Sequence, residues 1–168
     1  MAYTASTLSF ILENLNKTVV LTGSQIPLSE LRNDAVDNLL GSLLVAGPYL
    51  IPEVVIFFGN RLFRGNRCCK ENSLQLAAFN SPNMEPLARF DVSFDINWDR
   101  VLPHSTGHFK LHKKLETAIS FIYLSPTINI KAIESVFSNS KAVILAGYGM
   151  GNLPTLNLQL MQIISQAI

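Results

Sequence analysis

Two short apolar segments rich in β-branched residues constrain the fold of this chain most strongly. Residues 18–22 read Thr-Val-Val-Leu-Thr, and residues 53–58 read Glu-Val-Val-Ile-Phe-Phe. Continuous apolar runs of this length are typical of strands buried on both faces of a parallel sheet. Between them, residues 33–46 carry a helical pattern that begins at a favourable cap and is followed by Gly-Pro. Strand, helix and strand in this order predict a doubly wound sheet.

A further helix is expected before the first strand. Leu8, Ile11, Leu12 and Leu15 fall at helical spacing, which predicts an amphipathic helix from about Ala2 to Leu15. The first sixty residues therefore alternate helix, strand, helix, strand. We interpret the fold class as α/β, with most of a doubly wound, mainly parallel N-terminal sheet domain.

The pattern changes in the second half of the chain. Residues 61–79 predict a hairpin with a loop that holds Lys70, and residues 92–96 alternate like an exposed strand. The elements expected after that are strands at 118–123 and 142–146, a helix at 129–137 and a last helix from Thr155. We place the domain boundary so that residues 1–103 form the remainder of the N-terminal domain and residues 104–168 the start of a smaller α/β C-terminal domain.

Composition excludes several classes of protein. The chain of 168 residues is 48% hydrophobic and 15% charged, which is typical of a soluble globular protein rather than a disordered one. The net charge of +1 offers no electrostatic attraction to nucleic acid or to a membrane surface. The apolar runs are shorter than the roughly 20 residues of a spanning helix. No secretory signal is expected, and the adjacent Cys68 and Cys69 favour a reducing, cytoplasmic location.

The loop that follows residues 18–22 is the first candidate site. Open α/β sheets bind ligands at the carboxyl ends of their strands, so Gly23, Ser24 and Gln25 are placed to face a small polar substrate. An ordinary strand-to-helix turn explains the same residues equally well. The residue pattern alone leaves both interpretations open.

Lys70 is the second candidate. An amine accepts a proton only when burial or neighbouring cations favour its neutral form, and Arg61, Arg64 and Arg67 lie close in sequence. They contribute only if they point toward Lys70. From composition alone, a solvated basic hairpin is the simpler interpretation.

Two other motifs suggest ligands but fit them poorly. Residues 147–152 form a glycine-rich loop between a strand and a helix, yet Pro154 stands where a dinucleotide fingerprint has its third glycine. His104, His108 and His112 are spaced by four, but Pro103 disfavours the helix that would align them on a metal. We expect neither a bound nucleotide nor a metal.

Several motifs, in order along nearly the whole chain, resemble those of type I, cytosolic L-asparaginases. They are Leu21-Thr-Gly-Ser-Gln25, Leu31-Arg-Asn-Asp34, Phe57-Phe-Gly-Asn60, Arg64-Gly-Asn-Arg67 with Lys70, Asp95-Ile-Asn-Trp98 and Tyr148-Gly-Met-Gly-Asn152 with Pro154. The segment from Ala2 to Leu15 is similar to the helix that follows a His-Gly-Thr-Asp-Thr-Met signature in animal members. Met1 would be the methionine of that signature.

The resemblance implies a hydrolase that converts L-asparagine and water to aspartate and ammonia. In the family, one threonine forms an acyl-enzyme, while a second threonine, an aspartate and a lysine relay the proton. By this likeness Lys70 is the catalytic lysine, and Ser24 and Gln25 bind the substrate. The resemblance implies no metal or organic cofactor, and a homo-oligomer in the full-length form.

The sequence departs from the family in three respects. Both threonines and the relay aspartate would precede Met1, and the chain would stop just inside the second domain. Ala35 stands where the family has glycine, which would cost about 1 kcal/mol at a positive φ. We therefore expect activity in the full-length parent and none in this chain alone. The alternative is a catalytically inactive truncated product that acts as a subunit-binding module.

Overall fold

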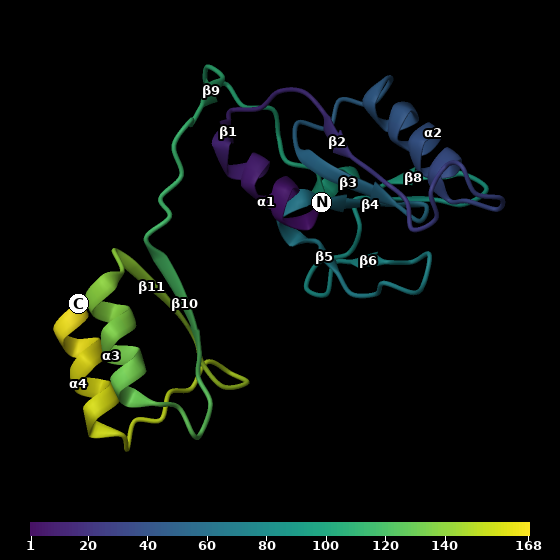
Figure 1. Ribbon diagram of the computed structural model, residues 1–168. Helices are drawn as coiled ribbons and strands as arrows, with labels where there is room; N and C mark the ends of the chain where they lie inside the picture. The colour runs from purple at the N-terminus through teal and green to yellow at the C-terminus, as the bar shows by residue number, and fades with distance from the viewer. The chain divides into compact units, whose positions relative to one another are not determined.

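A five-stranded mixed sheet lies at the centre of the first half of the computed structural model, which describes all residues from 1 to 168 (Figure 1). Its strand order is β2-β3-β4-β7-β8. The strands are β2 (Val19–Leu21), β3 (Val54–Phe58), β4 (Arg61–Arg64), β7 (Ala88–Phe90) and β8 (Phe94–Ile96). The two apolar segments are thus confirmed as strands, with the second buried at every residue.

The expectation of a mainly parallel sheet is wrong. Only β2 and β3 pair in parallel, and every other pairing in this sheet is antiparallel. The cause is the two-residue turn after β3, where Gly59 and Asn60 have φ values of 56° and 58°. Positive φ at both positions is the requirement of a type I′ hairpin turn, so the chain reverses directly into β4.

Two helices cover opposite faces of the sheet, α1 (Ala2–Ile11) and α2 (Ala35–Ala46). Side chains alternate along β3, so Ile56 packs in one cluster with Ala5 of α1, and Phe57 in the other with Val45 of α2. The first half of the chain is therefore a mixed α/β fold with a helix on each face of its sheet. Ala35 is the first residue of α2 and is not among the residues with positive φ. The backbone strain that a positive φ would cause at this alanine is therefore absent.

Helix α1 is shorter than expected. It ends at Ile11 and is followed by β1 (Leu12–Glu13), which pairs antiparallel with β9 (Lys110–Leu111). Asn14 then takes a φ of 57°, which turns the chain toward β2. Leu12 and Leu15 still pack against the cluster beneath α1, so the apolar spacing identified buried residues but not the end of the helix.

A small hairpin carries Lys70. After β4, the 3₁₀ helix η1 (Gly65–Arg67) leads into β5 (Cys69–Lys70), which pairs antiparallel with β6 (Phe79–Asn80). Lys70 therefore lies in a strand, opposite Phe79, and not in the loop expected from the sequence. A second 3₁₀ helix, η2 (Trp98–Arg100), follows β8.

The chain divides into two compact units, Met1–Lys113 and Lys114–Ile168. The second contains parallel strands β10 (Ile119–Tyr123) and β11 (Ala142–Ala146) and helices α3 (Ile130–Asn139) and α4 (Leu158–Ala167). All four elements were expected, although α4 begins after Thr155. The domain boundary between residues 103 and 104 stays a prediction. No helix in the chain is long and apolar enough to cross a membrane.

Candidate functional site

The loop with Ser24 and Gln25 begins where β2 ends, beside the end of its parallel neighbour β3. The Thr22 hydroxyl donates to the carbonyl oxygen of Phe57 at 2.9 Å, which ties the ends of the two strands together. Ser24 and Gln25 are both half-buried. The candidate loop thus occupies the edge at which open α/β sheets bind ligands.

Gln25 brings the loop and Lys70 together. The ammonium Nζ of Lys70 donates to Oε1 of Gln25 at 3.0 Å, across 45 residues of sequence. Nε2 of the same side chain donates to the carbonyl oxygen of Gln75, also at 3.0 Å. The side-chain amide of Gln25 therefore contacts strand β5 through Lys70 and the loop between β5 and β6 through Gln75. No hydrogen bond links Ser24 directly to Lys70.

Asp34 fixes the backbone of the same loop. Its carboxylate accepts the backbone N–H groups of Gln25 and Ile26 at 2.9–3.1 Å and the side-chain amide of Asn38 at 3.1 Å. Burial tends to raise the pKa of Asp34, but these donors outweigh burial and hold the pKa below its ordinary value. Asp34 is therefore a charged anchor for the loop.

Asn38 joins the ends of both parallel strands from within α2. It is 2% exposed, and its Nδ2 also donates to the carbonyl oxygen of Gly23 at 2.9 Å. Its Oδ1 accepts the backbone N–H of Gly59 at 3.0 Å. In the sequence, Asp34 stood out at the start of a helix and in the motif Leu31-Arg-Asn-Asp34, but not as an anchor for the preceding loop. An aspartate with an asparagine four residues later on one helix face was the available signal for this pair.

Two of the three arginines close to Lys70 in sequence, Arg61 and Arg64, have partners elsewhere. Arg64 donates from Nη2 to Oε1 of Glu53 at 2.9 Å and to the carbonyl oxygen of Arg100 at 2.6 Å. The guanidinium of Arg61 lies over the ring of Phe63, 5.2 Å from its centroid. The condition under which these cations would favour a neutral Lys70 is therefore not met by Arg61 or Arg64.

A cavity of about 510 Å³ adjoins Lys70. Its walls come from the start of α1, η1 and the β5–β6 hairpin, namely Met1, Ala2, Tyr3, Ser6, Asn66, Cys68, Cys69, Lys70 and Phe79. The ring centroid of Phe79 lies 6.0 Å from Nζ of Lys70. A space of this size beside a lysine has room for a small amino acid.

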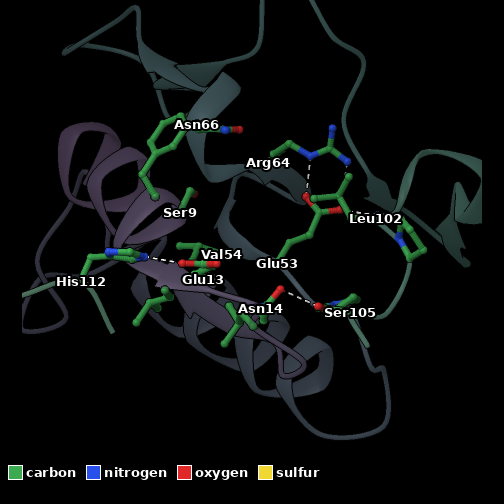
Figure 2. Close-up of a pocket in the computed structure, with 15 residues that line it drawn as sticks. Ser9, Glu13, Asn14, Glu53, Val54, Arg64, Asn66, Leu102, Ser105 and His112 are labelled. Carbon is green, nitrogen blue, oxygen red and sulfur yellow. Dashed lines mark hydrogen bonds and ion pairs between the residues drawn. The ribbon is translucent and has the colours of Figure 1, made fainter. Parts of the chain in front are cut away.

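A second cavity, of about 460 Å³, lies where β3 begins and is drawn in Figure 2. The Glu53–Arg64 pair and the contact between Glu13 and His112 line it. The predicted site residues Ser24, Gln25 and Lys70 do not. This cavity therefore has no part in the candidate site.

No group of three histidine, cysteine, aspartate or glutamate side chains is arranged to hold a metal ion. The glycine-rich loop closes on itself through the N–H of Tyr148, which donates to the carbonyl oxygen of Asn152 at 3.0 Å. Since α4 begins only at Leu158, the loop does not lead directly into a helix as a dinucleotide site requires.

The family model described as "Asparaginase, N-terminal" matches residues 1–102. The chain belongs to the asparaginase family. It is close to the type I enzymes in particular: L-asparaginase 1 of Escherichia coli is 44% identical over 155 residues, which cover 92% of the chain and 46% of that protein. The resemblance read from the ordered motifs is thereby confirmed.

The chain is also similar to a solved bacterial structure and to a mouse protein. The crystal structure of L-asparaginase I from Vibrio cholerae matches 99% of the chain and 51% of its own length, with a TM-score of 0.90 and 41% identity. A 60 kDa lysophospholipase of Mus musculus is 44% identical over 157 residues, which cover 92% of the chain and 28% of that protein. The chain spans about half the length of its bacterial relatives, and less of the mouse protein.

Proposed function

We propose that this chain contributes to the hydrolysis of L-asparagine to L-aspartate and ammonia, as part of a longer asparaginase. Lys70 is the catalytic lysine of that reaction, and Ser24 and Gln25 bind the substrate. The observation that carries the proposal is the 3.0 Å bond between Nζ of Lys70 and Oε1 of Gln25, which joins two separate family motifs at the carboxyl end of β2.

The proposed chemistry is acyl transfer. A threonine hydroxyl oxygen bonds to the carbon of the side-chain amide, the C–N bond breaks, and the nitrogen leaves as ammonia after gaining a proton. Water then hydrolyses the resulting ester to release aspartate and the threonine. Lys70 passes the proton within a relay that also includes a second threonine and an aspartate. The residues of this chain supply the lysine and the substrate loop, and the reaction uses no metal or organic cofactor.

We also propose a cellular location, an oligomeric state and a class of partner for the longer protein. We place it in the cytoplasm, because Cys68 and Cys69 are free thiols and the matched relatives include type I asparaginases. The longer protein forms a homo-oligomer, with residues 1–103 in its N-terminal domain and residues 104–168 at the start of its C-terminal domain. It binds a small molecule, and neither nucleic acid nor a membrane.

The decisive experiment compares two products of the native transcript. Sequencing upstream of the Met1 codon defines the longest in-frame protein, which is purified beside the 168-residue chain. Ammonia release from L-asparagine is then measured for both, and fatty-acid release from lysophosphatidylcholine is measured as the comparison. We expect turnover of asparagine by the longer protein only, and its loss in the Lys70→Met variant. A folded longer protein without asparaginase activity would contradict the proposal.

A second candidate function is favoured by one observation on α2. Five large apolar side chains on this helix are 45–60% exposed: Val36, Leu39, Leu40, Leu43 and Leu44. An exposed apolar stripe of this kind is typical of a contact surface between proteins. The chain would then act by binding intact subunits without catalysing a reaction. Co-purification of the tagged chain with the longer protein tests this function, and separate elution of the two would exclude it.

A further inference from the structure

We propose that Gln25 is a positioning residue for Lys70, and that Asp34 and Asn38 hold the loop from which Gln25 reaches it. The inference rests on the proposed function, because the orientation of Lys70 matters for the reaction only if Lys70 carries the proton. Gln25 thus orients the side chain of Lys70, in addition to its proposed contact with the substrate.

The orientation of the Gln25 amide is determined by its two partners. Its Nε2 faces the carbonyl oxygen of Gln75, which can only accept a hydrogen bond. Its Oε1 is therefore the atom that faces Lys70, whose ammonium can only donate. Both bonds are satisfied in one rotamer, so the amide holds the lysine in a defined place.

The acceptor of the Lys70 hydrogen bond, the amide oxygen of Gln25, is neutral. A neutral acceptor suits a lysine that must lose its proton. The ion pairs of the structure involve other residues, and none includes Lys70. The nearest carboxylate in sequence, Glu71, accepts from the side-chain amide of Asn80 at 3.1 Å. The other titratable groups that line the cavity beside Lys70 are Tyr3, Cys68, Cys69 and the amino terminus. A carboxylate in place of the Gln25 amide would stabilise the ammonium form, whereas the amide orients it without adding charge.

The loop that carries Gln25 is built around Asp34 and Asn38. Three backbone groups, the N–H of Gln25, the N–H of Ile26 and the carbonyl of Gly23, are bound by these two side chains. Asn38 is buried and bonds further to the N–H of Gly59, at the turn that leads into β4. Asp34 and Asn38 therefore fix the loop relative to both parallel strands. The hydrogen bond from Lys70 to Gln25 then places Lys70 relative to that loop.

The test measures the amine of Lys70 directly in the 168-residue chain. The rate at which N-hydroxysuccinimidyl acetate acetylates Lys70 is followed by mass spectrometry as a function of pH. In the near-isosteric variant Gln25→Glu, we expect the pH profile of Lys70 to move upward by about half a pH unit, as an exposed ion pair allows. In Gln25→Met, which has no acceptor, we expect no upward shift. A Gln25→Glu profile that coincides with that of the original chain would overturn the proposal.

The variant Asn83→Asp controls for the change in net charge. It alters the charge as Gln25→Glu does, but the side chain of Asn83 lines a separate hollow beside Met84. We expect its Lys70 profile to match that of the original chain. If Asn83→Asp moved the profile as far as Gln25→Glu does, the shift would reflect general electrostatics and the positioning role would be refuted.

Asp34 is tested by a double-mutant cycle, because it acts on Lys70 only through the loop. Asp34→Asn preserves size but replaces one carboxylate oxygen by an NH2 donor, which would face the N–H of Gln25 and the side-chain amide of Asn38. In that background we expect Gln25→Glu to shift the Lys70 profile by less than half as much, since the carboxylate is no longer held beside the amine. An undiminished shift would remove Asp34 from the proposal.

These readouts separate the inference from the proposed function. A shifted Lys70 profile with no asparagine hydrolysis by the longer protein would refute the function and leave the positioning role. Hydrolysis with an unchanged profile in Gln25→Glu would refute the positioning role and leave the function.

Discussion

Cys68 and Cys69 are neighbours in sequence but occupy different environments. Cys69 is exposed, whereas Cys68 packs against the cluster beneath α1. Burial, followed by the nearby Cys69 and Glu71, raises the pKa of the Cys68 thiol to about 12, against an opposing effect of Arg61. At pH 8 only about one Cys68 in ten thousand would be a thiolate, and thiolate is the reactive form.

We therefore predict selective alkylation of Cys69. Iodoacetamide at pH 8 should label Cys69 while Cys68 stays free until the chain is unfolded, as peptide mass spectrometry will show. The Cys69→Ser variant should remain unlabelled in its folded state. Rapid labelling of Cys68 in the folded chain would contradict its burial.

Arg64 and Glu53 form a buried ion pair that supports the sheet. The side chains of Arg64 and Glu53 are 16% and 2% exposed, and Glu53 also accepts the N–H of Leu102 at 2.7 Å. In Arg64→Met the Glu53 carboxylate would lose its counter-charge, so we expect the free energy of unfolding to fall by about 3–5 kcal/mol. Urea titration followed by circular dichroism measures this loss. The double variant Arg64→Met with Glu53→Gln should recover part of it, and a loss below about 1 kcal/mol in the single variant would be the contrary result.

The sequence offered Lys70 and the Ser24–Gln25 loop as candidates, but the bond between Lys70 and Gln25 could not be read from it. It depends on how the β5–β6 hairpin folds back toward the end of β2, which periodicity does not encode. The role of Asp34 could not be read from the sequence either. A cap residue and a loop anchor have the same sequence signature, and only the long-range geometry tells them apart.

At the scale of elements, helix α2 lies unusually close to β3 because of Gly41. A Cβ atom at this position would lie 2.2 Å from Cζ of Phe57, a ring that is 1% exposed and packs edge-on against Phe90. Phe57 therefore has little room to move. We predict that Gly41→Ala lowers the free energy of unfolding by about 1–3 kcal/mol despite the better helix propensity of alanine.

Thermal and urea unfolding of Gly41→Ala test this packing argument. Gly149→Ala is a suitable control, because a Cβ there would meet no atom within 4 Å. We expect that control to unfold like the original chain. Stabilisation of the chain by Gly41→Ala would mean that propensity, and not the close approach of α2, decides the effect.

The β1–β9 pair is a pH-sensitive contact. His112 contacts Glu13, and the N–H of His112 donates to the carbonyl oxygen of Ile11 at 2.9 Å. The bond with His112, then the charge of Lys110, hold the pKa of Glu13 below its ordinary value despite a small opposing effect of burial. A carboxyl with a lowered pKa stabilises the folded form above its ordinary pKa, and this contribution is lost as the pH falls through the lowered value.

We therefore expect the protection of the His112 amide against hydrogen exchange to fall as the pH is lowered through the carboxyl range. The effect is small, because both side chains are exposed. Glu13→Gln should show lower protection at neutral pH and little further change on acidification. Equal pH dependence in the original chain and in Glu13→Gln would exclude Glu13 as the titrating group.

The sheet illustrates what the sequence could predict at the scale of elements. Apolar, β-branched runs identified β2 and β3, because burial on both faces leaves a continuous apolar pattern. The expectation of a mainly parallel sheet was wrong, because β4 pairs antiparallel with β3, and the Gly59-Asn60 pair was a readable hairpin signal for this reversal. The apolar pattern was given more weight than this turn signal. The turn at Gly59-Asn60 nevertheless makes β4 antiparallel to β3.

At the scale of the whole molecule, the chain consists of two units joined by an exposed connection. Residues 112–118 have no regular secondary structure, and Lys113 and Lys114 are both exposed. Beyond them, Glu116 is bound to the second unit, since it pairs with Lys141 at 2.6 Å and accepts the N–H of Ala118 at 2.9 Å. The most accessible backbone for a protease is therefore the short stretch around Lys113 and Lys114.

We predict that limited trypsin digestion cuts the chain first at this connection, giving N-terminal fragments that end at Lys113 or Lys114. Proteases require several residues of extended, unpaired backbone, which the strands and helices on either side do not offer. Intact mass spectrometry over a time course identifies the first cut. Replacing both lysines by glutamine should slow the first cleavage without changing the circular dichroism spectrum. A first cut after Lys70 or Arg67, with this connection intact, would instead mean that the β5–β6 hairpin opens more readily than the link between the units.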